Sequence, residues 1–191
     1  MLFRSVIPDM IEAGTFLALS YMTNSKIRIK GADKRELASF IAPIEAAGGK
    51  IGYEDGYAIA GGEITRPIEI ETAPYPAFPT DLQPIIAPLL LKFSGGKIRE
   101  GVWQGRFGYL SELGKLGARY TVNSDVATLY KSDLHSSNVS APDLRGGAGL
   151  VLTALALDGT TVIDNAELIM RGYESLPEKL RQLGAKISVK S

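Results

Sequence analysis

Apolar positions along the chain alternate between two periods, one typical of helices and one typical of strands. Between residues 82 and 90 the apolar side chains are three or four residues apart, which places them on one face of a helix. Residues 185–189 instead alternate at every second position, which is the period of a strand with two different faces. Helical and strand-like segments follow one another along the whole chain, so the pattern predicts an α/β fold.

One order of helical and strand-like segments occurs three times along the chain. Each repeat has a helical segment, a short strand-like segment, a second helical segment that ends at glycine, and then further strand-like residues. The first helices begin near Met10–Glu12, Asp81–Gln83 and Asp143–Arg145, the short strands cover 26–29, 97–100 and 161–164, and the closing glycines are Gly48, Gly117 and Gly184. We therefore expect one domain over residues 1–191, with repeat units at about 6–74, 75–140 and 141–191.

The third repeat is cut short. The first repeat continues after its glycine with strand-like segments at 57–60 and 68–70, and the second with 127–130 and a short candidate near Val139. After Gly184 only residues 185–189 have the pattern of a strand. This strand would have an uncovered edge unless the strand-like residues 3–7 fold back to close the third unit. Uncovered strand edges recruit other chains, so we expect association with a second copy there.

The predicted helix ends carry the residues that helix ends require. Asp81 and Asp143 stand where a side chain accepts hydrogen bonds from the free N–H groups of a first turn, and Pro84 lies in such a turn. The closing glycines stand where a helix needs a left-handed residue. The run Gly146–Gly149 opens a predicted helix, where it either offers N–H groups to an anion or permits close helix packing.

Composition narrows the classes of function. Lysine and arginine number 21 and aspartate and glutamate number 21, so the chain lacks the basic surface of a nucleic-acid-binding protein and we expect no such partner. The absence of cysteine excludes disulfides and thiolate metal sites, and a single histidine excludes multi-histidine metal centres. That residue, His135, lies in the polar stretch 133–137, which we interpret as a solvated loop rather than the site of a hydrolase.

No segment has the composition of a membrane span. The longest apolar stretch, Gly147 to Leu157, is far shorter than the roughly 20 residues that a span needs. The N-terminal residues include Arg4 and Asp9, and no hydrophobic export signal follows them. We therefore expect a cytoplasmic protein that does not cross a membrane.

Five ordered motifs resemble those of one enzyme family. They are Pro8–Phe16, Ala77–Gln83, Gly105–Phe107, Asp143–Arg145 and Arg171–Glu174. The chain resembles, over about residues 6–189, the C-terminal half of the UDP-N-acetylglucosamine enolpyruvyl transferases, which belong to the EPSP synthase-like superfamily. The resemblance implies one globular domain of an inside-out α/β barrel, built from three helix-and-sheet units with approximate threefold symmetry. It also implies a partner N-terminal domain that this sequence does not contain.

The resemblance implies a reaction and a set of site residues. The family transfers the enolpyruvyl group of phosphoenolpyruvate to the 3-hydroxyl of UDP-N-acetylglucosamine, by addition and then elimination of phosphate, in peptidoglycan synthesis. Asp81 matches the proposed general base and Arg171 a second catalytic residue. The residues that match substrate-binding positions are Val102, Arg106, Asp143 and Arg145. Arginine suits such substrates because its planar fork binds carboxylate and phosphate in pairs. We expect no metal and no cofactor.

The same residues also have ordinary structural interpretations. Asp81 and Asp143 would serve as N-caps in any helix, and Val102 would look the same in a hydrophobic core. Single arginines are usually solvated surface charges. A convergent pocket of Arg106, Arg145 and Arg171 is the hypothesis that the three motifs together favour.

The chain also departs from the family pattern. Gln104 and Gly105 replace the family's glutamate and asparagine, Met170 replaces an aspartate, and Met10 replaces an arginine. Because the partner domain with its catalytic lysine is missing from this sequence, we expect the isolated half to be inactive. An expressed fragment, a split enzyme and a degenerate paralogue all remain open. The alternative function is a non-catalytic module that binds a nucleotide sugar or another protein. A sibling enzyme acting on shikimate phosphate shares the fold but fits the motifs less well.

Overall fold

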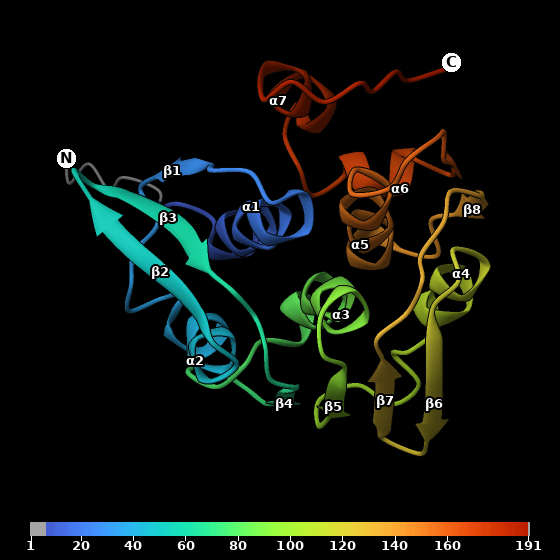
Figure 1. The fold of residues 1–191 in the computed structure, drawn as a ribbon, viewed down its shortest axis with the longest axis horizontal. Helices are drawn as coiled ribbons and strands as arrows, with labels where there is room; N and C mark the ends of the chain where they lie inside the picture. Colours follow the sequence, from blue (N-terminus) through green and yellow to red (C-terminus); the bar gives the residue numbers. More distant parts are fainter. Residues whose placement is uncertain (1–6, 191) are drawn as a thin grey trace, which may run out of the picture.

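The longest helices lie at the centre of the molecule, and the strands lie outside them (Figure 1). The computed structural model describes residues 7–190. The helices are α1 (Met10–Thr23), α2 (Ala38–Ala46), α3 (Gln83–Lys92), α4 (Tyr109–Lys115), α5 (Leu144–Ala154), α6 (Glu167–Met170) and α7 (Leu176–Gln182), and the 3-10 helix η1 covers Thr80–Leu82. The strands are β1 (Arg28–Lys30), β2 (Gly49–Glu54), β3 (Tyr57–Gly62), β4 (Ile68–Thr72), β5 (Gly96–Glu100), β6 (Arg119–Asn123), β7 (Val126–Tyr130), β8 (Asn138–Ser140) and β9 (Val162–Asp164).

The strands form three separate sheets. The first has the order β1-β3-β2, the second β4-β5-β7-β6, and the third consists of β8 and β9. Strand β4 comes from the first repeat but pairs in parallel with β5 of the second, and β8 of the second pairs in parallel with β9 of the third. Each of these two sheets therefore contains a strand that the preceding repeat supplies.

The hydrophobic core lies between the sheets and is filled by α1, α3 and α5, which contact one another in pairs. Helix α3 is the most enclosed, because every residue from Gln83 to Leu91 is buried. Pro84 stands in its first turn, where the missing N–H group costs no hydrogen bond. The sequence predicts that only one face of this helix is apolar and buried. In the structure the residues between those of the predicted face are buried as well.

The run Gly146–Gly149 at the start of α5 allows neighbouring elements to approach closely. A Cβ atom on Gly149 would lie 2.5 Å from the carbonyl oxygen of Pro84, and one on Gly147 would lie 2.6 Å from the Ile169 side chain. Of the two interpretations of this run, the structure supports close packing. The backbones of helix α3 and helix α5 can come into contact here only because Gly149 has no side chain.

The three closing glycines have the predicted conformation. Gly48 has φ of +109°, Gly117 +92° and Gly184 +93°, and each follows the end of a helix. The chain leaves α2 and α4 in this way and enters β2 and β6. Left-handed backbone at this position is expensive for residues with a Cβ atom, which explains the glycine.

The strand predicted at residues 185–189 does not form. This segment follows Gly184 but has no regular secondary structure. Its sequence Gly-Ala-Lys-Ile-Ser-Val matches Gly117–Val122, the start of β6, which is held by hydrogen bonds to β7. Within residues 7–190 no strand of the third sheet takes the place that β7 has in the second. The expected strand therefore lacks its hydrogen-bond partner. The strand predicted at 3–7 falls, except for Ile7, outside the described residues.

Two further absences concern residues 7–190. No helix in this part of the chain is long and apolar enough to span a bilayer. The same residues bring together no group of three or more histidine, cysteine, aspartate or glutamate side chains able to hold a metal ion.

Candidate functional site

Asp81 is held between two arginines rather than at a helix cap. It lies in η1, immediately before α3, and its side chain forms no capping hydrogen bond. One carboxylate oxygen, Oδ1, accepts a hydrogen bond of 2.7 Å from Nη2 of Arg106, and Oδ2 accepts one of 3.1 Å from Nε of Arg145. The N-cap interpretation of Asp81 is therefore wrong. Its side chain is 40% exposed, so the carboxylate remains accessible from solvent.

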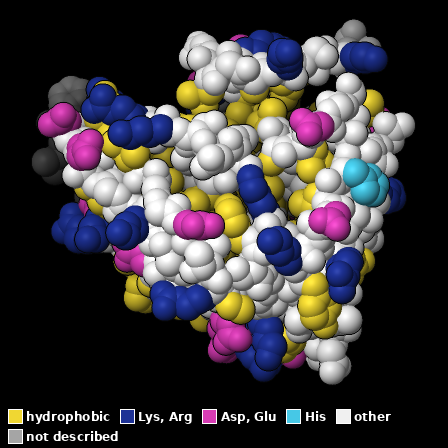
Figure 2. Space-filling view, in the orientation of Figure 1, with side chains coloured by type: hydrophobic (Ala, Val, Ile, Leu, Met, Phe, Trp, Pro, Cys, Tyr) yellow, Lys and Arg dark blue, Asp and Glu magenta, His cyan; other side chains and the backbone are white. Residues whose placement is uncertain are grey.

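Three segments far apart in the sequence build this cluster. Asp81 comes from the turn that starts α3, Arg106 from the loop between β5 and α4, and Arg145 from the first turn of α5. The loop with Arg106 can fold back because Gly105 adopts a φ of +73°. Figure 2 shows Lys and Arg side chains over the middle of the face under which α3 and α5 lie.

Arg145 is the more enclosed of the two cations. Its side chain is 14% exposed, and its guanidinium carbon lies 5.1 Å from the centre of the Tyr173 ring. Burial acts to lower the pKa of Arg145, but the Tyr173 oxygen and the Asp81 carboxylate outweigh it and raise the pKa above its ordinary value. The residue therefore stays cationic. Its Nη1 is buried and has no hydrogen-bond partner among the described residues.

The aromatic ring of Tyr173 lies against the guanidinium group of Arg145. Its hydroxyl is 2.8 Å from Oγ1 of Thr15 in α1, and burial is the main reason that the pKa of Tyr173 is raised. In this position the buried ring stabilises the cation of Arg145. The motif Arg171–Glu174 thus contributes to the cluster through Tyr173, a residue that the sequence analysis did not single out.

Arg171 itself stands apart from this cluster. It follows α6 directly, its side chain is exposed, and within residues 7–190 it takes part in none of the ion pairs. The described structure thus joins Arg106 and Arg145 through Asp81 and does not join Arg171 to them.

Asp143 and Val102 have different surroundings. Asp143 is the N-cap of α5, because its Oδ1 accepts a hydrogen bond of 2.8 Å from the N–H of Gly146. The structural interpretation of Asp143 is therefore correct. Val102 is 38% exposed in the loop after β5, and the neighbouring Trp103 is 60% exposed. Val102 is thus not a core valine, and the loop offers apolar surface to solvent beside Arg106.

Glu100 is a member of the site that the sequence analysis missed. It ends β5, is 5% exposed, and accepts hydrogen bonds from the hydroxyl of Thr80, which precedes Asp81, and from the N–H of Val102, among others. The alternation of β5 contains the signal, since Glu100 shares the inward face with Ile98. A carboxylate on the buried face of a strand requires several donors, and such donors mark an organised region.

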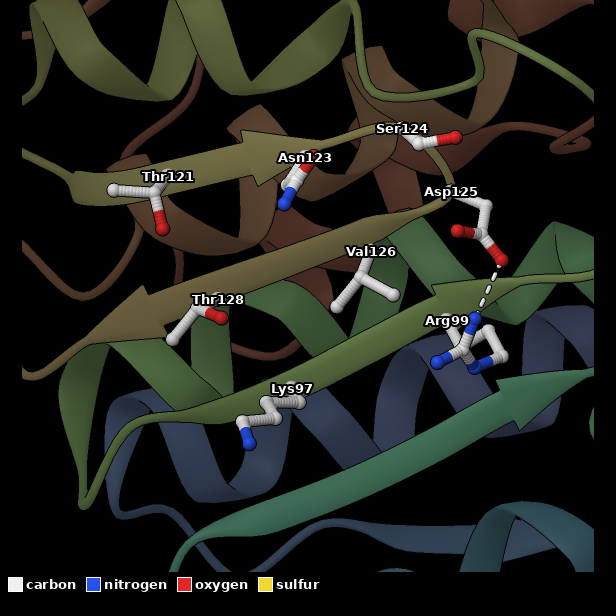
Figure 3. A pocket seen from close by; sticks show the side chains of 8 residues that line it. All are labelled: Lys97, Arg99, Thr121, Asn123, Ser124, Asp125, Val126 and Thr128. Carbon is white, nitrogen blue, oxygen red and sulfur yellow. Dashed lines mark hydrogen bonds and ion pairs between the residues drawn. The ribbon is translucent and has the colours of Figure 1, made fainter.

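A shallow polar hollow lies on the outer face of the second sheet (Figure 3). Lys97, Arg99, Asn123 and Asp125 line it, and Nη1 of Arg99 already donates to Asp125 over 2.6 Å. Successive side chains of β5 point to opposite faces, so this hollow is on the face opposite to Glu100. Arg99 is paired with Asp125, and the residues that line this hollow form no cluster of converging charges like the one around Asp81.

Comparison with known proteins identifies the family. A family model described as EPSP synthase (3-phosphoshikimate 1-carboxyvinyltransferase) matches residues 3–180. The chain belongs to this family. A curated relative from Lactobacillus johnsonii, named UDP-N-acetylglucosamine 1-carboxyvinyltransferase, is 40% identical over 191 residues, which are 97% of this chain and 45% of the relative. A relative from Streptococcus thermophilus, named UDP-N-acetylglucosamine 1-carboxyvinyltransferase 2, is 41% identical over 96% of this chain and 44% of its own length.

Solved structures of the family share the fold. The enolpyruvyl transferase NikO from Streptomyces tendae superposes with a TM-score of 0.87 at 31% identity, over 97% of this chain and 45% of NikO. EPSP synthase from Acinetobacter baumannii has a TM-score of 0.68 at 12% identity, over 98% and 45%, which is a likeness of fold alone. The predicted fold class, one half-sized domain of the inside-out α/β barrel, is confirmed. The chain spans less than half of the curated relatives it matches.

Proposed function

We propose that this chain forms one wall of the active site of an enolpyruvyl transferase that acts on phosphoenolpyruvate and UDP-N-acetylglucosamine in peptidoglycan synthesis in the cytoplasm. The observation that carries the proposal is the carboxylate of Asp81, accessible and held between Arg106 and Arg145 where three segments meet. The names of the curated relatives support the choice of sugar nucleotide.

The cluster has the chemistry for anionic substrates. Phosphoenolpyruvate carries a carboxylate and a phosphate, and both bind arginine through paired hydrogen bonds. Such a substrate would compete with Asp81 for the donors of Arg106 and Arg145. Binding would thereby release at least one oxygen of Asp81 from its ion pair.

The released oxygen of Asp81 would then serve as general base. In the proposed addition, the sugar 3-hydroxyl oxygen bonds to carbon 2 of phosphoenolpyruvate, Asp81 takes the hydroxyl proton, and carbon 3 gains a proton. In the elimination, carbon 3 loses a proton and the bond from carbon 2 to the phosphate oxygen breaks, which yields inorganic phosphate and the enolpyruvyl ether. Arg171 and Val102 would contact the substrates from exposed positions, and Asp143 would fix the start of α5 and so place Arg145.

The isolated chain is proposed to be inactive, because a site between two domains needs both walls to orient the reactants. The test is phosphate release from the two substrates, first by residues 1–191 alone and then with the N-terminal half of the Lactobacillus johnsonii relative added in trans. We expect release only from the mixture. Sustained release by the chain alone would contradict the proposed inactivity, and no release from a mixture that forms a stable complex would count against the transferase function.

The alternative, a module that binds a nucleotide sugar without turnover, is favoured by the replacements at Gln104, Gly105 and Met170. The same mixture separates the two functions. Binding of UDP-N-acetylglucosamine to the complex without phosphate release would support the module. Replacing the acceptor by shikimate 3-phosphate tests the sibling activity, and we expect no release with it.

A further inference from the structure

Glu100 is a buried carboxylate that accepts hydrogen bonds from β4, from η1 and from the loop after β5. Its Oε1 accepts hydrogen bonds from the hydroxyl of Thr72 at 2.7 Å and from the N–H groups of Val102 and Trp103 at 3.0 Å each. Its Oε2 accepts one from the hydroxyl of Thr80 at 2.9 Å. Thr72 in turn accepts a hydrogen bond of 2.9 Å from the N–H of Gly101. The carboxylate is thus satisfied by protein donors on both oxygens.

These donors belong to the two segments that carry the charged groups of the site. Thr80 immediately precedes Asp81 in η1, and Val102 and Trp103 begin the loop that leads to Arg106. The relative position of Asp81 and Arg106 therefore depends on two sets of hydrogen bonds to the same carboxylate, one from Thr80 and one from the start of the loop. A loop of this kind, which contains a left-handed Gly105 and exposes a tryptophan, has little else to fix its start.

We propose that Glu100 is the positioning residue that sets the placement of Asp81 relative to Arg106 and to the exposed loop at Val102. The proposal rests on the proposed function for its catalytic consequence but not for its structural part. Glu100 does not act as acid or base itself, because it is enclosed and both of its oxygens are occupied. It acts through Thr80 on the base and through the Val102 and Trp103 amides on the loop.

The chemistry of the four hydrogen bonds predicts which variants keep the arrangement. In Glu100→Gln, the amide oxygen can still accept from Thr72, Val102 and Trp103, while the amide NH2 donates to the Thr80 hydroxyl, which can turn to accept. In Glu100→Ala, all four donors lose their acceptor. Thr80→Val removes only the hydrogen bond between residue 80 and Glu100, next to Asp81, and Thr80→Ser keeps this hydrogen bond. Glu71→Ala is the matched control, since Glu71 is an exposed glutamate on neighbouring β4.

The first measurement uses the chain itself. Amide hydrogen exchange of Val102 and Trp103, followed by NMR, should be about tenfold or more faster in Glu100→Ala, with little change in Glu100→Gln or Glu71→Ala. Trp103 is the single tryptophan, so its fluorescence anisotropy should fall in Glu100→Ala alone. Unchanged exchange and anisotropy in a folded Glu100→Ala would overturn the structural part of the proposal, whatever the function of the chain.

The second measurement addresses positioning for the reaction. In the complex with the N-terminal half, Thr80→Val should lower kcat by at least about tenfold with a smaller effect on the KM for phosphoenolpyruvate, and Thr80→Ser should restore kcat. Thr80→Val also leaves a route open if Glu100→Ala does not fold. Equal activity of Thr80→Val and the unchanged complex would overturn the placement of Asp81 by Glu100. Absence of turnover in the unchanged complex would instead count against the proposed function.

Discussion

Asp81 is the residue at which sequence and structure differ most usefully. Taken alone, the sequence favours an N-cap, because aspartate before an apolar helical pattern is usually one. The structure places Pro79 and η1 there and turns the carboxylate to two arginines. Neither the 3-10 turn nor the pairing can be predicted from local pattern, since the arginines come from residues 25 and 64 positions away. Only the family resemblance predicted a role for Asp81 other than that of a cap.

This geometry changes what Asp81→Asn should do to stability. The variant loses two partly exposed ion pairs, so we expect the free energy of unfolding to fall by about 1 kcal/mol, measured by urea unfolding. Phosphate release by the complex with the N-terminal half should fall by about a hundredfold to ten-thousandfold, because asparagine cannot take the hydroxyl proton. Asp125→Asn, which breaks the exposed Arg99 pair on the outer face, is the control. Full activity of Asp81→Asn would remove it from the role of base.

At the scale of elements, the helix and strand order was largely readable from the sequence. The short strands expected at 97–100 and 161–164 are β5 and β9, and the weak candidate near Val139 is β8. The local hydrophobic period and the glycines at the ends of helices are sufficient to predict this order of elements. Residues 185–189 show the limit, because a strand exists only where another strand bonds to it, and that partner is not encoded in the segment's own pattern. Glu100 was missed for a related reason, since two of its four donors, Thr72 and Thr80, lie 28 and 20 positions away.

Gly149→Ala tests the contact between α3 and α5. Alanine favours helix, but its Cβ would lie 2.5 Å from the Pro84 carbonyl oxygen, so the helices must separate. We expect a loss of about 1–3 kcal/mol in the free energy of unfolding. Gly108→Ala is the matched control, because a Cβ there meets no atom within 4 Å and its φ is −56°. Equal thermal midpoints of the two variants would show that the helices can move apart without cost.

Glu112 links α4 to β8 and makes this link sensitive to pH. Burial acts to raise the pKa of Glu112, but hydrogen bonds from Lys115 and from the N–H of Ser140 outweigh it and leave the pKa below 4.5. A folded-state pKa below the unfolded one contributes stability above about pH 4.5, and this is lost as the pH falls through the folded value. Urea unfolding at pH 7 and pH 3 should therefore show a smaller acid-induced loss for Glu112→Gln than for the unchanged chain. An identical loss would contradict this role.

At the scale of the whole molecule, the third sheet is the incomplete part. It has two short strands, whereas the second sheet has four, and Val162 of β9 is exposed. The proposed association with a second copy therefore shifts from residues 185–189, which form no strand, to the edge of β9 that pairs with no strand among residues 7–190. We expect the mass measured by light scattering to rise with concentration.

The repeats also suggest how to complete that sheet. Gly117–Ser124 leads through a turn into β7, and Gly184–Ser191 has a similar sequence. Appending the sequence of Asp125–Tyr130 after Ser191 supplies the missing inner strand. We expect a higher thermal midpoint, more strand signal in circular dichroism and a mass that no longer depends on concentration. An extension of equal length made of glycine and serine is the control, and equal behaviour of the two would exclude a vacant strand position beside β9.

The parallel pairs β4–β5 and β8–β9 have a consequence for how such a protein could have arisen. Since the first and second repeats each give their last strand to the following sheet, a single ancestral repeat of this kind would have carried one strand too many and lacked another. Only identical copies that exchanged these strands around a closed ring would have satisfied every edge. Gene duplication would then have joined chains that were already an assembly of such copies.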